Sequence, residues 1–103
     1  MNVIIQSLGF KAGAELENYI RQKIENIRPN DYITGANVML FMGPDRATPL
    51  DYCEIRLEIP GNDLFVKEDA GDFYAAADAC IDKLEKMMRK HKEKIVDRFH
   101  GKA

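Results

Sequence analysis

The chain has 103 residues, of which 46% are hydrophobic and 31% are charged, and its formal net charge is −2. This length predicts a single domain over residues 1–103, and the composition is typical of a soluble globular protein rather than a disordered or fibrous one. The two cysteines are too few and too far apart in sequence to suggest a metal knuckle or a redox pair, and no stretch approaches the roughly 18 apolar residues of a membrane span.

The first part of the chain predicts a strand followed by a helix. Residues 2–8 read as a strand, with Val3 and Ile5 expected to face the core. Residues 14–28 place apolar side chains at intervals of three and four, which is typical of an amphipathic helix. We expect Pro29 to end this helix, because proline disfavours the helical conformation in the residue before it.

The middle of the chain predicts three strands joined by turns. Residues 35–42, 52–59 and 64–67 alternate in the manner of strands with one buried face. Residues 43–51 and 60–63, which separate them, are rich in Pro, Gly, Asp and Asn, as loops and turns are. The side chains expected to face the core are Ala36, Val38, Leu40, Met42, Cys53, Ile55, Leu57, Ile59, Leu64 and Val66.

The opposite face of these strands combines aromatic and basic side chains. They are Met39, Phe41, Tyr52 and Phe65, beside Arg56 and Lys67. Such a surface could stack the bases of single-stranded RNA. However, Glu54 and Glu58 fall on the same face and would repel phosphates, so cross-strand packing or a dimer contact is the interpretation that the pattern favours.

Residues 71–100 form the longest periodic run and carry most of the positive charge. The apolar positions of this expected helix fall within one sector roughly 100° wide. They are Phe73, Ala77, Cys80, Ile81, Leu84, Met88, His91 and Ile95. Asp72 is placed to cap the start of the helix. Four lysines fall in a second sector, roughly 120° away: Lys83, Lys86, Lys90 and Lys94.

The charge is distributed very unevenly along the chain. From residue 83 to the end there are eight Lys or Arg and three Asp or Glu, a net charge of +5. The first 82 residues have a net charge of −7. This asymmetry predicts an anionic partner for the last helix.

The order of elements predicts an α+β fold with the sequence β-α-β-β-β-α. The first crossover contains a helix, so the first two strands should be parallel neighbours, and the remaining strands should form an antiparallel meander. Every strand has one apolar face, so we expect a four-stranded mixed sheet with two helices packed on one face.

The residues give no sign of an enzyme or of a cofactor. There is no glycine-rich phosphate loop, no metal-spaced cluster of His or Cys and no nucleophile elbow. His91 on the apolar helix face is more typical of a packed residue near the edge of the domain than of a contact to a partner. Cys53 and Cys80 sit at apolar positions, so we expect two buried free thiols, neither a disulfide nor a metal, and a cytoplasmic protein.

Several motifs on the last helix together resemble one family. They are Asp72-Phe73-Tyr74-Ala75-Ala76, Asp78, Ile81-Asp82-Lys83-Leu84 and Lys90-His91-Lys92-Glu93-Lys94. This set resembles the ribosome hibernation promoting factors, also called ribosome-associated inhibitors or sigma-54 modulation proteins. The likeness spans the whole chain, includes Phe10 and Lys23, and is to the short form of the family.

The resemblance implies a protein that binds the small ribosomal subunit in the channel for messenger and transfer RNA. There it would inhibit translation in stationary phase or stress, by occupying a site and not by catalysis. The residues implied to face ribosomal RNA are Lys23, Lys83, Lys86, Arg89, Lys90, His91, Lys92 and Lys94. Tyr74 and Asp78 are expected to have a structural role, in ring packing and capping. Where ribosome dimers form, a helper factor would contribute.

Two other interpretations stay open. One is a small protein–protein adaptor that forms a weak homodimer through the outer face of the sheet. The other is a general double-stranded RNA-binding domain, because the βββα portion of the order is shared with that kind of domain.

Overall fold

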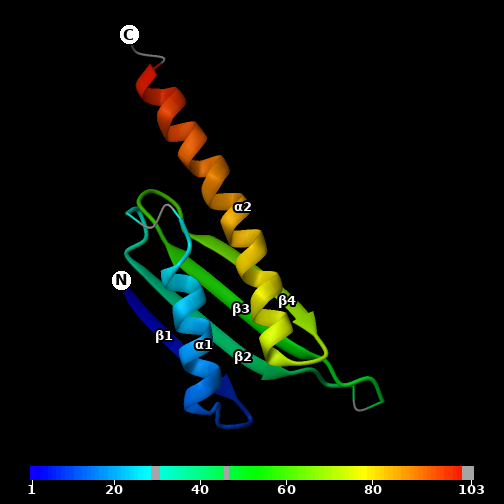
Figure 1. Cartoon of the computed structure of the whole chain (residues 1–103). Helices are drawn as coiled ribbons and strands as arrows, with labels where there is room; N and C mark the ends of the chain where they lie inside the picture. The colour runs from blue at the N-terminus through cyan, green and yellow to red at the C-terminus, as the bar shows by residue number, and fades with distance from the viewer. Residues whose placement is uncertain (29–30, 46, 101–103) are drawn as a thin grey trace.

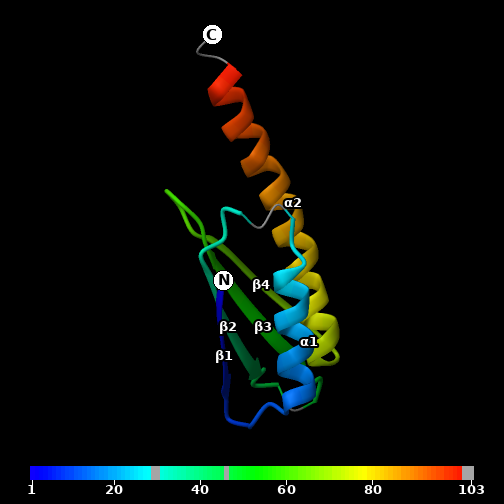
Figure 2. The ribbon, with the colours of Figure 1, turned by 60° about the vertical axis from the view of Figure 1, so that its left-hand side comes forward.

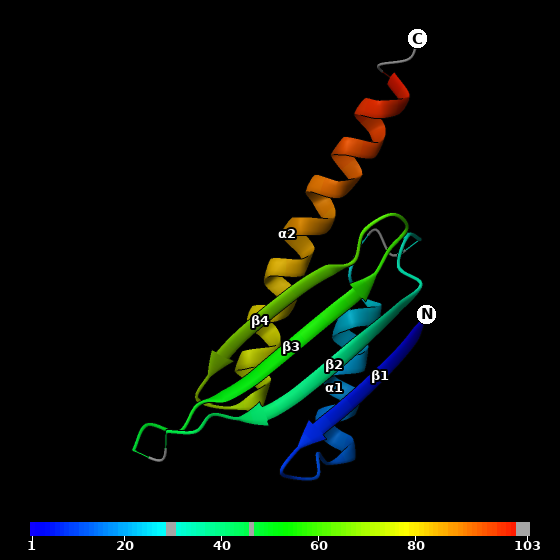
Figure 3. The same cartoon turned by 180° about the vertical axis from the view of Figure 1, so that it is seen from behind.

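The computed structural model describes residues 1–28, 31–45 and 47–100, with side chains as far as Lys90. The six elements follow the order β1 (Asn2–Leu8), α1 (Ala14–Glu25), β2 (Gly35–Met42), β3 (Asp51–Glu58), β4 (Leu64–Ala70) and α2 (Phe73–His100). The four strands form one sheet in the order β1-β2-β3-β4 (Figure 3). β1 is parallel to β2, and the other neighbours are antiparallel. The predicted β-α-β-β-β-α fold and its mixed sheet are therefore confirmed.

Both helices cover the same face of the sheet, and the core lies between them and the strands (Figures 1 and 2). The alternation expected for the strands decides which side chains enter this core. The largest fully buried side chains are Ile20, Ile24, Ile27, Leu40, Ile55, Leu57, Leu84, Met88, Cys53 and Cys80. Met42 is an exception to the prediction, because it is 54% exposed. It stands in the last pair of the β2–β3 ladder, opposite Asp51, where the chain leaves the sheet.

Helix α1 ends at Glu25, three residues before the predicted end. The Asn26 N–H donates to Gln22 O at 3.0 Å, and the Ile27 N–H then donates to Ile24 O at 3.1 Å in a tighter turn. This turn keeps Ile27 fully buried although it is no longer part of the helix. Apolar periodicity therefore continues past the helix itself, which is why the sequence predicted a longer one.

Strand β4 continues to Ala70, three residues beyond its predicted end, and β3 begins at Asp51, one residue early. The added segment of β4 pairs Cys53 with Glu68, Tyr52 with Asp69 and Asp51 with Ala70. Its charged residues break the apolar alternation, so only the pairing with β3 extends the strand. This partner is not visible in a local pattern.

The start of α2 is fixed by a cap and by an aromatic contact. Asp72 Oδ1 accepts a hydrogen bond from the Ala75 N–H at 2.8 Å, which confirms the predicted cap. The ring of Phe73 stacks on Phe10, with centroids 4.7 Å apart. Phe10 lies between β1 and α1, so this contact packs the first residue of α2 against the β1–α1 loop.

Both cysteines are buried free thiols, as predicted. Cys80 on α2 donates from Sγ to the carbonyl oxygen of Cys53 on β3 at 3.1 Å. The pKa of Cys53 is raised, first by its hydrogen bond to Cys80 and then by burial, so this thiol stays protonated. The pair thus acts as small apolar core residues joined by a weak hydrogen bond.

Candidate nucleic-acid interface on helix α2

Helix α2 is held against the sheet by its apolar face, which determines where its basic side chains point. Ala77, Cys80, Leu84 and Met88 are fully buried along this face. Further along, the helix extends past the sheet, as the orange and red turns in Figure 1 show. The core therefore fixes the backbone of this part of α2, and with it the direction in which the exposed side chains of the helix point.

The basic side chains on α2 whose positions the structure describes are all exposed. They are Lys83, Lys86, Arg89 and Lys90. Lys83 forms an ion pair with Glu68 of β4, and this hydrogen bond raises the pKa of the Lys83 ammonium. Its positive charge is thus partly compensated within the protein. Lys86 and Lys90 form no ion pair with any of the residues whose side chains the structure describes.

Lys23 does not join this group. It lies on α1, with Nζ 5.4 Å from the ring centroid of Tyr19. Tyr19 contacts the flank of α2 that faces α1, whereas the ion pair of Lys83 places that lysine on the flank that faces β4. The two predicted contact residues therefore lie on opposite sides of α2. The predicted His91, Lys92 and Lys94 lie outside the residues whose side chains the structure describes.

The flank of α2 toward α1 carries a set of aromatic and polar contacts. The Tyr19 hydroxyl donates to Asp78 Oδ1 at 2.7 Å, and this hydrogen bond raises the pKa of Tyr19. The Tyr74 ring meets the Tyr19 ring edge-on, with centroids 5.0 Å apart. Ring packing was expected for Tyr74, but Asp78 does not cap the helix. It joins α2 to α1 instead, a role that needed knowledge of how the two helices pack.

Replacing Tyr19 by phenylalanine should loosen this contact without disturbing the core. The ring stays, but Asp78 loses its hydrogen-bond donor, so we expect the thermal unfolding midpoint to fall by a few degrees. Tyr74→Phe is the matched control, since the Tyr74 hydroxyl makes no hydrogen bond to any of the described residues. Thermal unfolding followed by circular dichroism measures both variants. Equal midpoints for the two would contradict a stabilising role for the Tyr19 hydroxyl.

The outer face of the sheet is occupied by contacts between its own side chains. The rings of Phe41 and Tyr52 lie parallel with centroids 5.1 Å apart. Lys67 Nζ lies 5.5 and 5.4 Å from the two centroids and 3.8 Å from Glu54 Oε1. The charge of Lys67 is thus paired with a carboxylate. These contacts favour cross-strand packing over base stacking at this place.

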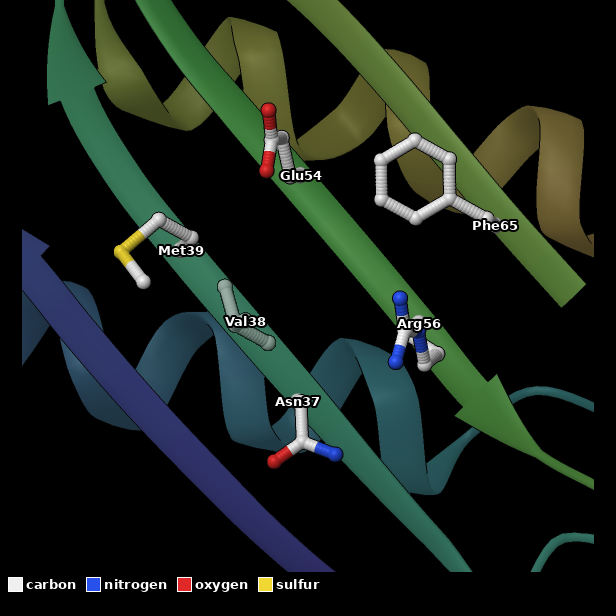
Figure 4. Close-up of a pocket in the computed structure, with 6 residues that line it drawn as sticks. All are labelled: Asn37, Val38, Met39, Glu54, Arg56 and Phe65. Atoms are coloured by element: carbon white, nitrogen blue, oxygen red, sulfur yellow. The ribbon is translucent and has the colours of Figure 1, made fainter. Parts of the chain in front are cut away.

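A shallow hollow of about 120 Å³ lies on the sheet beside β2, β3 and β4 (Figure 4). It is lined by Asn37, Val38, Met39, Glu54, Arg56 and Phe65. Its two charged groups, Glu54 and Arg56, have opposite signs. Among the described residues no group of three or more His, Cys, Asp or Glu is placed to hold a metal ion. Within the described part of the chain, no helix has the length and apolar content needed to cross a bilayer.

The sequence is similar to one family and to named relatives in it. The family model described as "Sigma 54 modulation protein / S30EA ribosomal protein" matches residues 3–96. A ribosome hibernation promoting factor of Pseudomonas putida is 32% identical over 104 residues, which cover 100% of this chain and 98% of that protein. The protein of the same name from Azotobacter vinelandii is 31% identical over 87 residues, covering 84% and 78%.

Two solved structures have a similar fold. A ribosomal subunit interface protein from Coxiella burnetii superposes with a TM-score of 0.81 at 19% identity, covering 90% of this chain and 99% of that one. The N-terminal domain of Protein Y from Thermus thermophilus gives 0.72 at 24% identity, covering 88% and 99%. At these identities the likeness concerns the arrangement of the strands and helices.

Proposed function

Because the chain belongs to the sigma 54 modulation protein / S30EA ribosomal protein family, we propose that it is a ribosome hibernation factor that binds the small ribosomal subunit. It would occupy the channel for messenger and transfer RNA and inhibit translation in stationary phase or stress. The relatives that carry the name ribosome hibernation promoting factor support a ribosome-associated role. The proposed mechanism is occupancy of a site, with no reaction catalysed.

The observation that carries this proposal is the row of exposed lysines on α2. Lys86 and Lys90 project from a helix whose other side is buried in the core. Little further conformational entropy is lost in positioning them against a row of phosphates. Each ammonium that neutralises a phosphate also releases condensed counterions, which favours binding at low salt.

The acidic remainder of the molecule contributes to how it would bind. Residues 1–82 have a net charge of −7, and residues 83–103 a net charge of +5. Ribosomal RNA would attract the end of α2 that extends past the sheet and repel the body of the domain. The protein would therefore approach RNA helix-first, with the acidic sheet turned toward solvent or toward ribosomal protein.

Co-sedimentation on a sucrose gradient tests the proposal. Purified protein mixed with small subunits, large subunits or a naked RNA duplex should travel with the small subunit and leave it as salt is raised. Equal binding to the naked duplex would indicate a general double-stranded RNA-binding domain. Absence from both subunits at low salt would contradict the proposed function.

A further inference from the structure

Strand β1 is an edge of the sheet and carries no charged residue. Its sequence is NVIIQSL, and it has a neighbour on one side only (Figure 3). Ile4 and Leu8 are 45% and 56% exposed. The other edge strand, β4, carries Lys67, Glu68 and Asp69 in succession. Charges and prolines on an edge strand discourage a further strand from adding to it, and β1 lacks both.

The backbone of β1 presents a regular set of donors and acceptors at this edge. The Asn2 N–H donates to Thr34 O at 3.4 Å, where the pairing with β2 begins. Successive residues of a strand direct their backbone groups to opposite sides, so Ile4, Gln6 and Leu8 also turn theirs toward β2. The residues whose N–H and C=O groups point to the free edge are Val3, Ile5 and Ser7.

We infer that β1 pairs with β1 of a second copy of the chain, antiparallel and centred on Ile5, so that two sheets join into one. In this register Ile5 lies opposite Ile5 of the second copy, and Val3 lies opposite Ser7. These are pairs of the hydrogen-bonded kind, each of which exchanges two N–H···O bonds. Every backbone group that these three residues turn to the free edge is thereby satisfied.

A second copy suits this edge because the pairing brings no like charges together. On the outer face, Ile4 lies against Gln6 of the second copy and Leu8 lies against Asn2. The two-fold axis runs perpendicular to the sheet, so the helices of both copies stay on one side of it. On a partner strand with charged side chains, those charges would lie against the apolar Ile4 and Leu8, where β1 offers no opposite charge to pair with them.

The contact is narrow, and this limits its strength. A strand of seven residues is about 23 Å long, so its edge falls well short of the ~800 Å² per partner of a stable complex. The dimer is therefore weak and depends on protein concentration. It is independent of ribosome binding and forms in the purified protein alone.

Two double variants with opposite expected outcomes test both the edge and the register. Ile4→Lys with Gln6→Lys places lysine against lysine twice across the two-fold axis. Ile4→Lys with Gln6→Glu places lysine against glutamate twice. We expect the first to weaken dimerisation by about tenfold or more relative to the second. Both positions are exposed, so both variants should fold like wild type in circular dichroism.

Sedimentation velocity over micromolar to millimolar concentrations gives the measurement. The wild-type average mass should rise from one chain toward two. A wild-type protein that stays monomeric throughout, or two double variants that dimerise equally, would overturn the inference. Phe65→Lys on the outer face of β4 is the control and should dimerise like wild type. If that variant alone lost the dimer, the contact would lie on the sheet face and not at the β1 edge.

Discussion

Replacing Lys86 and Lys90 by glutamine lowers the affinity for ribosomes by roughly 10–100-fold at ~0.1 M salt, if α2 is the contact surface. Two phosphate contacts are lost, together with the counterions that they release. The log–log dependence of affinity on salt should therefore become shallower by roughly 1.5 units. Binding to small subunits, measured over a series of salt concentrations, gives both quantities. The fold should be unchanged, because exposed charges contribute little to stability.

The matched control removes the same charge elsewhere. Lys11→Gln with Lys67→Gln lowers the net charge by the same amount, at exposed positions outside α2. We expect this variant to bind nearly as well as wild type, since neither lysine belongs to the helix. If the two variants lost affinity equally, the effect would come from net charge alone. If only the control lost affinity, the outer face of the sheet would be the contact surface.

Truncation of the core between sheet and helix should have the largest effect on stability. Leu57 of β3 and Leu84 of α2 are fully buried, so replacing either by alanine leaves a cavity that the neighbours fill only in part. We expect each change to lower the free energy of unfolding by ~2–5 kcal/mol. Denaturant unfolding measures the loss.

An exposed leucine serves as the control for this measurement. Leu8 is 56% exposed, and its replacement by alanine should change the free energy of unfolding by no more than ~0.5 kcal/mol. If Leu57→Ala and Leu84→Ala also changed the free energy of unfolding by less than ~0.5 kcal/mol, the result would contradict the packing of α2 on β3 described above. Leu84→Ala should also weaken ribosome binding, since α2 is then held less firmly.

Local patterns predicted most of the fold because each element except β4 has a clear period. The strands at residues 2–8 and 35–42 have the predicted bounds, and the cap at Asp72 is as expected. The segment 68–70 was missed because its charged residues carry no strand pattern of their own. It is extended by pairing with β3, and pairing between distant segments is not encoded in a local window.

The candidate site shows the same division. The lysine row on α2 follows from helical spacing alone, since the buried face fixes which side is exposed. The ion pair between Lys83 and Glu68 could not be predicted, because it depends on α2 lying beside β4. The hydrogen bond from Tyr19 to Asp78 could not be predicted either, because it joins residues of different helices. The separation of Lys23 from Lys83 also follows from packing and not from sequence.

The two buried thiols can be used to measure how often α2 and the sheet are separated. Cys53 and Cys80 lie between β3 and α2 and are fully shielded from solvent. A thiol-reactive reagent can reach them only when α2 separates from the sheet. At moderate reagent concentration, where the helix closes again faster than the thiols react, the labelling rate therefore measures the equilibrium population of the open form. A partner that binds α2 and stabilises the closed form would slow the labelling of both cysteines. Binding could then be followed without attaching a dye or tag to the protein.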